Sequence, residues 1–256
     1  MSSAAISQTR VPAWLMRTLV ILFLLGIWEA GSQFGYINAF TAPPPSAIFF
    51  AFIRLVEAGD ITRALALTFF EAFTGASIGT IVGVSVGYLL HRSKMAGLAY
   101  TSWVAAAASA PLVLIYPLFL VIFGRNPATI IAMGALGCMP PIILKAKEGL
   151  DGVRPVLLNV GRALNLNARK QFWMIQFPAA LPTIFNGIRI GLLFAIINVV
   201  GVEFLISLGG LGYMIAYLGD RFDYPAMYAG ILFVIFVSIV FFLLTERLEK
   251  WLLSSR

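Results

Sequence analysis

The stretch NVGRALNLNARKQFWMIQFPAALP, residues 159–182, gathers basic and amide side chains between two long apolar stretches. Arg162, Arg169 and Lys170 fall within nine positions, with Asn165 and Asn167 between them. Guanidinium and ammonium groups pair with carboxylates and phosphates. The chemistry predicted here is therefore charge pairing, either with anionic lipid head groups or with a groove of a soluble partner.

Residues for other chemistry are scarce. The chain has one cysteine, Cys138, and one histidine, His91, which makes a disulfide framework or a metal site improbable. It has no G-x-x-x-x-G-K-[ST] sequence, so it carries no phosphate-binding loop of the P-loop kind. We expect a protein that is not an enzyme, that holds no cofactor, and that takes any ATP-derived energy from another polypeptide.

The composition is that of a membrane protein. Of 256 residues, 60% are hydrophobic and 11% are charged, against about 25% charged in soluble domains. Long apolar runs predict an all-α, polytopic protein with one domain and about six transmembrane helices. The six predicted spans are 14–36, 64–90, 98–124, 127–146, 181–206 and 226–246.

The distribution of lysine and arginine predicts the orientation. With the N-terminus inside the cell, the cytoplasmic segments hold thirteen basic residues and the outer segments four. The thirteen are Arg10, Arg17, Arg92, Lys94, Lys145, Lys147, Arg154, Arg162, Arg169, Lys170, Arg247, Lys250 and Arg256; the four are Arg54, Arg63, Arg125 and Arg221. Cytoplasmic loops collect positive charge, so both termini and residues 159–182 are expected in the cytoplasm. The same rule explains the net charge of +7, so this charge does not indicate nucleic-acid binding.

Glycines and prolines inside the predicted spans indicate two further structural features. Gly75, Gly79, Gly83 and Gly87 are four apart, so they share one helix face, where another helix can approach closely. A substrate path or a subunit interface is the alternative use of that face. Prolines inside the third and fourth spans free carbonyl groups, which is tolerated in packed helices or at a cavity. These are Pro111, Pro117, Pro140 and Pro141.

Segment 154–178 is predicted to form one or two short helices along the cytoplasmic face. Pro155 suits a first helical turn, while Pro178 and Pro182 are expected to end the segment before the next span. A second surface helix is expected after Ser46, because the run Pro43–Pro45 cannot itself be helical.

The basic segment resembles the cytoplasmic signature of the transmembrane permease subunits of bacterial ABC importers. That signature reads E-A-A, three residues, G, nine residues, then I-x-L-P. Ile175 and Pro178 match it at the right spacing, whereas NVG at 159–161 replaces E-A-A and Asn165 replaces the glycine. The stretches LIYPLFLVIFG (114–124), FPAALPTIFNGIRIGL (177–192) and VVGVEFLISLGGLGYMI (199–215) resemble the sulfonate, nitrate and taurine branch of the family.

The resemblance implies a type I importer fold in the bacterial inner membrane, with a coupling helix that seats in the partner ATPase. It implies two ATPase subunits that hold ATP and Mg²⁺, a solute-binding protein outside, a second copy of this chain, and contact with membrane lipid. The coupling residues it implies are Asn159, Val160, Gly161, Arg162, Asn165, Leu166, Asn167, Arg169, Lys170, Ile175 and Pro178.

A translocation path or gate is expected from Pro111, Pro117, Pro140, Glu203, Gly209, Gly210 and Tyr213. A charge at the bilayer centre costs roughly 2.5–3.5 kcal/mol, so Glu203 should have a use. Residues 207–225 are read as an outer loop that serves as a gate, a docking surface or a plain connection. Glu71 is predicted to be interfacial, His91 to be solvated, and Arg189 to snorkel to the inner surface.

Three other classes of protein remain possible from the residues alone. A secondary transporter would need intramembrane acids in a relay, an enzyme would need converging catalytic groups, and a channel would not need the basic segment. The cargo is open as well. The branch points to a small organic or inorganic anion, and a pyrimidine or a vitamin-like solute is the alternative.

Overall fold

The computed structural model describes residues 12–254, and all regular structure within that range is helical. The predicted all-α fold is confirmed for this part of the chain. Arg10 and Arg256, two of the predicted cytoplasmic cations, lie outside the described residues. Five helices of the described range are long and apolar enough to cross a membrane, or six if one bent pair counts as a single span.

The long helices are α1 (Ala13–Gln33), α3 (Asp60–Arg92), α6 (Pro127–Asp151), α9 (Phe177–Ile206) and α11 (Tyr224–Ser254). The bent pair consists of α4 (Lys94–Ser109) and of α5 (Tyr116–Phe123) with the short 3-10 helix η1 (Leu112–Ile115) before it. The smaller elements are α2 (Pro45–Glu57), α7 (Pro155–Ala163), α8 (Ala168–Gln171), the π-helix η2 (Phe172–Gln176) and α10 (Gly210–Asp220).

Proline and asparagine begin several of these helices. Pro45, Pro127 and Pro155 each occupy a first-turn position, where the missing N–H has no intrahelical partner to lose. Pro45 therefore belongs to α2, although the sequence suggested a non-helical proline run. The side chain of Asn126 caps α6 by accepting a 2.8 Å hydrogen bond from the Ala128 amide.

The predicted third span is broken in the structure. Helix α4 ends at Ser109, and the chain turns by 91° before α5. Ala110 is extended (ψ 142°) because it precedes Pro111, which disfavours helical geometry in the residue before it. The run 98–124 is thus two helices at a right angle and not one rod.

The fifth predicted span begins earlier than expected. Helices α8, η2 and α9 run on without a break from Ala168 to Ile206, so Pro178 does not end the helix. The π turn of η2 ends two residues before this proline, and such local widening re-pairs the backbone groups that a proline frees.

The four spaced glycines of α3 all pack against α6. A Cβ added at Gly75 would lie 2.7 Å from the Ile131 carbonyl oxygen, and one at Gly87 would lie 2.6 Å from the Ala146 Cβ. Gly79 and Gly83 are buried against the same helix. The close approach of α3 and α6 therefore requires residues without side chains on this face.

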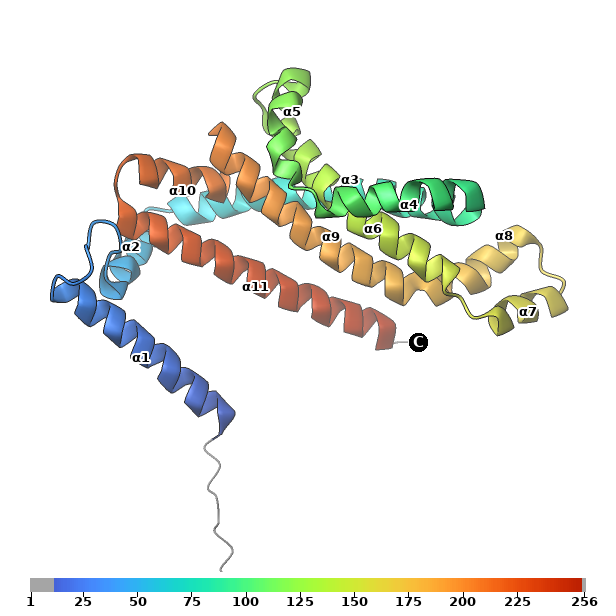
Figure 1. Ribbon diagram of the computed structural model, residues 1–256, viewed down its shortest axis with the longest axis horizontal. Coiled ribbons are helices and arrows are strands. Elements are labelled where there is room, and N and C mark those ends of the chain that lie inside the picture. The colour runs from blue at the N-terminus through green and yellow to red at the C-terminus, as the bar shows by residue number, and fades with distance from the viewer. Residues whose placement is uncertain (1–11, 255–256) are drawn as a thin grey trace, which may run out of the picture.

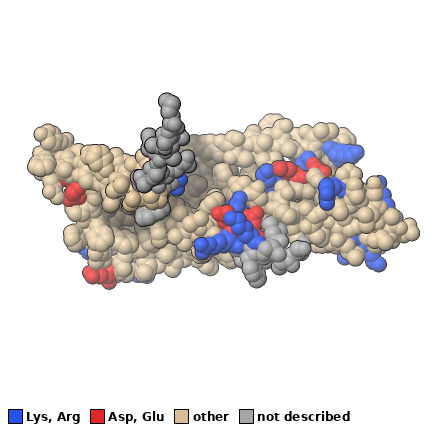
Figure 2. Space-filling model, turned by 90° about the horizontal axis from the view of Figure 1, so that it is seen from below, with Lys and Arg blue, Asp and Glu red and all other residues tan. Residues whose placement is uncertain are grey.

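The two ends of the molecule carry different elements. Figure 1 shows α2 and α10 at one end of the long axis, α7 and α8 at the other, and α1 standing apart from the main helical layer. Apolar side chains of α1 such as Leu22, Phe23 and Leu24 are exposed. Figure 2 shows large uncharged areas, with charged atoms gathered toward the α7 and α8 end and near the end of α11.

Candidate functional site

The basic segment, residues 154–178, folds back on itself at the end of the molecule that carries α7 and α8 (Figure 1). Gly161 of α7 is buried, and a Cβ there would lie 2.9 Å from Ile175 Cδ1 and 3.1 Å from Gln171 Cγ. The Gln171 side-chain amide donates a 3.1 Å hydrogen bond to the Leu158 carbonyl. These contacts fasten α7 to α8 and η2, so Gly161 and Ile175 hold the segment together from inside.

The turn between α7 and α8 depends on Asn165. Its φ of +51° is left-handed, a conformation that asparagine tolerates far better than most residues other than glycine. The Leu166 amide donates to the Gly161 carbonyl at 3.0 Å, and the Asn167 side chain caps α8 by accepting from the Lys170 amide at 2.8 Å. The asparagine at the signature's glycine position thus preserves the backbone shape that a glycine would allow.

We expect Asn165→Val to disturb this turn and Asn165→Gly to leave it intact. A left-handed residue with a Cβ costs about 1–2 kcal/mol, and a branched Cβ costs more. Hydrogen exchange of peptides covering residues 154–178 should be faster in Asn165→Val and unchanged in Asn165→Gly. Equal exchange in both variants would contradict the assigned role of the positive φ.

The outer face of the segment carries its exposed polar groups. Asn159, Arg162, Asn167, Arg169 and Lys170 are exposed. The Arg162 guanidinium donates a 3.2 Å hydrogen bond to the Asn159 side chain. Among residues 12–254, no carboxylate forms an ion pair with Arg169 or Lys170, so both charged ends are available to another molecule.

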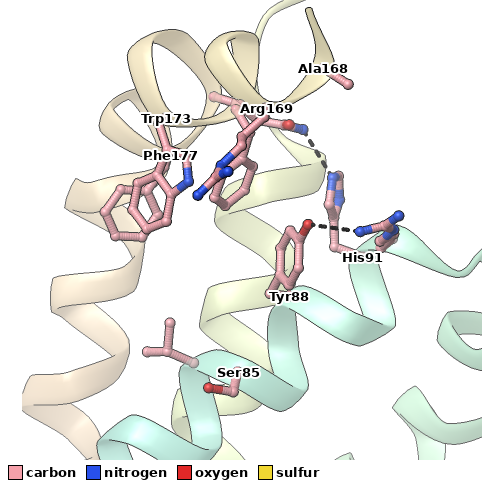
Figure 3. Close-up of a pocket in the computed structure, with 11 residues that line it drawn as sticks. Ser85, Tyr88, His91, Ala168, Arg169, Trp173 and Phe177 are labelled. Atoms are coloured by element: carbon pink, nitrogen blue, oxygen red, sulfur yellow. Dashed lines mark hydrogen bonds between the residues drawn. The ribbon is translucent and has the colours of Figure 1, made fainter.

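A cavity of about 820 Å³ lies between the end of α3 and the start of the long helix formed by α8, η2 and α9 (Figure 3). Arg92 and Arg169 line it from opposite elements, and Trp173 adds an aromatic wall. The rings of Tyr88 and Phe172 pack at 4.8 Å between centroids. Phe172 therefore anchors the basic segment to α3, whereas Trp173 remains 58% exposed.

His91 joins three elements beneath this surface, and the prediction of a solvated side chain was wrong. Its Nδ1 lies 2.6 Å from Asp151 Oδ1, and its Nε2 lies 2.9 Å from the Gln176 amide nitrogen. Lys147 pairs with the second oxygen of Asp151 at 2.6 Å. The ends of α3, α6 and η2 are thereby held together. Nothing local in the sequence signals contacts across 60 and 85 positions.

The predicted path and gate residues come from several different elements. Pro111 stands at the break after α4, Pro117 lies in the first turn of α5, and Pro140 is buried inside α6. Glu203 instead meets Gly210, at the end of the molecule opposite the basic segment.

Residues 207–225 contain a helix, α10, where the sequence suggested a loop. Gly209 and Gly210 have φ values of +133° and +84° and lead the chain into it. Tyr213 is half-buried on this helix and packs on Tyr217 at 5.8 Å between ring centroids.

Over residues 75–254 the chain matches the family described as the binding-protein-dependent transport system inner membrane component. The chain belongs to this family. Its members are transport components of the membrane and not enzymes, and the resemblance read from the sequence is confirmed. The matched range includes the basic segment, the four glycines, Glu203 and α10.

Several relatives bear names from the sulfonate, nitrate and taurine branch, and others are named for formylaminopyrimidine and riboflavin transport. A Bacillus subtilis protein named as an aliphatic sulfonates transport permease, SsuC, is 28% identical over 95% of this chain and 88% of its own. The taurine transport system permease TauC of Escherichia coli is 22% identical over 89% of this chain and 86% of its own. The nitrate import permease NrtB of Synechocystis is 27% identical over 73% and 68%.

The fold of this permease is also that of a solved importer. An inward-facing structure of the MetNI methionine ABC transporter superposes with a TM-score of 0.64, at 18% identity, over 76% of this chain and 96% of that chain. At this sequence identity the similarity shows the fold alone.

Two charged residues of the permease have partners that the sequence did not indicate. The Arg189 guanidinium pairs with Glu249 near the end of α11 at 3.0 Å and lies 5.5 Å from the Phe242 ring centroid. Glu71 is not interfacial, because its side chain is 1% exposed and lies against Glu203. Both contacts join helices that the sequence treats as separate spans.

Proposed function

We propose that this chain is the transmembrane subunit of an ATP-driven importer for a small organic or inorganic anion. The basic segment is the surface that engages the ATPase. The observation that carries the proposal is that this member of the permease family exposes Arg169 and Lys170. Neither side chain has a carboxylate partner among residues 12–254.

The complete transporter holds two copies of this chain, two ATPase subunits and a solute-binding protein. The ATPases bind ATP and Mg²⁺ and sit at the end formed by α7 and α8, which faces the cytoplasm together with both termini. The binding protein delivers solute at the end formed by α2 and α10. This orientation rests on the excess of basic residues in the predicted cytoplasmic segments.

Coupling follows the continuous helix. A movement of the ATPase displaces α8, and because α8, η2 and α9 form one helix from Ala168 to Ile206, the displacement passes directly into a span. The contact of Gly161 with Ile175 carries α7 along, and the His91 contacts with Asp151 and Gln176 carry the ends of α3 and α6. ATP thus shifts a two-state equilibrium between inward-open and outward-open forms.

The cargo we propose is a sulfonate, taurine or nitrate, because relatives over most of the chain bear those names. The solute-binding protein makes the first selection, and the permease accepts what it delivers.

The test is purification of the tagged chain in mild detergent from its own cells, followed by reconstitution into liposomes. We expect a dimer of this chain with two copies of an ATPase, and uptake of taurine, an alkanesulfonate or nitrate only when ATP and the binding protein are present. A chain that purifies without an ATPase and moves solute without ATP would overturn the proposal. Uptake of a pyrimidine or vitamin alone would overturn the cargo and leave the ATP-driven importer standing.

A further inference from the structure

Two carboxyl groups are buried together inside the permease. Glu71 of α3 is 1% exposed and Glu203 of α9 is 0% exposed, and the two side chains adjoin, because Glu203 accepts a hydrogen bond from Thr68, one helical turn before Glu71 on α3. Among the described residues, neither carboxylate forms an ion pair. Two ionised carboxylates in contact inside a membrane repel each other strongly and lack solvation, so such a pair must retain a proton.

Glu203 is built to carry the negative charge. Its Oε2 accepts a 2.9 Å hydrogen bond from the Gly212 amide and a 3.0 Å bond from the Thr68 hydroxyl. The Leu211 amide donates to the same Thr68 oxygen at 2.8 Å. The carboxylate thus sits at the N-terminus of α10, where backbone N–H groups and the helix dipole favour an anion.

The glycines at the start of α10 make these backbone hydrogen bonds to Glu203 possible. A Cβ at Gly210 would collide with the Glu203 carboxyl group, and one at Gly212 would collide with the Val200 carbonyl. The absence of a Cβ at positions 210 and 212 therefore lets the backbone of α10 reach the carboxylate directly.

Glu71 has the opposite environment. Neither of its oxygens receives a hydrogen bond from any described donor. The remaining unbonded oxygen beside it is Glu203 Oε1. A protonated Glu71 satisfies both groups at once, because its O–H donates to that oxygen. An ionised Glu71 would leave a buried charge without a partner, which is far costlier than a neutral acid.

Among the residues that the structure describes, the groups packed around the pair supply no cation to it. Arg125 is bound to the Ile206 and Ser207 carbonyls, 2.9 and 3.0 Å away. From α11, Ser238 donates to its own helix at Val234, and from α6, Thr129 donates to Gly124. The charged residues of α10, Asp220 and its neighbour Arg221, stand at the far end of that helix.

We propose that Glu71 and Glu203 form a proton-binding site that latches α10 to α3 and α9. At neutral pH Glu71 carries one proton and donates it in a hydrogen bond to ionised Glu203. Loss of that proton at higher pH places two negative charges in contact and releases α10. The site concerns the folded chain itself and is independent of which solute is carried.

Infrared spectroscopy of the permease in lipid nanodiscs tests where the proton resides. The C=O stretching band of a protonated carboxylic acid should be present at neutral pH, absent in Glu71→Gln and retained in Glu203→Gln. Glu29→Gln is the matched control, because Glu29 accepts hydrogen bonds from the Ser46 amide and hydroxyl, which favour the ionised carboxylate. No band in the parent, or a band lost in Glu203→Gln and kept in Glu71→Gln, would overturn the assignment.

Hydrogen exchange of α10 tests the latch. In the parent, protection of the amides at 210–220 relative to those of α6 should fall by about tenfold or more as pH rises through loss of the proton. Glu71→Gln mimics the protonated acid and should keep protection constant over the same range. Thr68→Val should lower protection at every pH and leave the infrared band unchanged. Identical pH profiles in the parent and Glu71→Gln would refute the latch.

Discussion

Gly79→Ala is expected to destabilise the permease by about 3 kcal/mol, at the upper end of the range for overpacked cores. The added methyl group would meet Cys138 Sγ and would lie 2.6 Å from the Ala135 carbonyl oxygen of α6. A side chain can rotate away, but a backbone carbonyl moves only if the whole of α6 moves. The midpoint of thermal unfolding in detergent should therefore fall by roughly 6–12 °C.

Gly26→Ala is the matched control for this substitution. Gly26 lies in the exposed helix α1, and an added Cβ would meet nothing within 4 Å. Alanine favours helix over glycine by up to about 1 kcal/mol, so this variant should unfold at the parent temperature or above it. Combining Gly79→Ala with Cys138→Ala should restore only part of the loss, because the carbonyl contact remains. A Gly79→Ala protein as stable as the parent would contradict the packing of α3 on α6.

The second large effect expected is loss of ATP-driven uptake when Arg169→Glu and Lys170→Glu are combined. Both side chains are exposed, and neither has a carboxylate partner among residues 12–254, so the reversal should leave the fold intact. Like charges brought together at an interface cost several kcal/mol. Uptake in proteoliposomes and the amount of co-purified ATPase should both fall by roughly tenfold or more.

The control for the double reversal is Arg17→Glu with Lys94→Glu. It changes the net charge equally and also alters exposed residues of the predicted cytoplasmic side, outside the basic segment. This variant should retain its ATPase and its uptake. Parent-like transport by the Arg169 and Lys170 variant would place the ATPase contact elsewhere. If the variant kept its ATPase and lost only the contact of the segment with anionic lipid, the segment would be a lipid-binding surface.

Much of this protein follows from its sequence because the relevant signals are local. Apolar runs longer than a bilayer predict helices, and the spacing of four in Gly75–Gly87 predicts a packed helix face. The excess of basic residues marks one set of loops, and Ile175 with Pro178 marks the family. Each of these signals depends on a few neighbouring positions and on whether a helix face contacts lipid, water or another helix.

Other features depend on how distant helices are placed, and only the tertiary structure decided them. Glu71 looks interfacial in sequence until α9 brings Glu203 against it from 132 positions away. His91 looks solvated until Asp151 and Gln176 arrive from α6 and η2. Pro178 looks like a helix end, yet the π turn before it lets the helix continue. A buried carboxyl or imidazole takes its role from the partners that packing supplies, and those partners carry no mark in the local pattern.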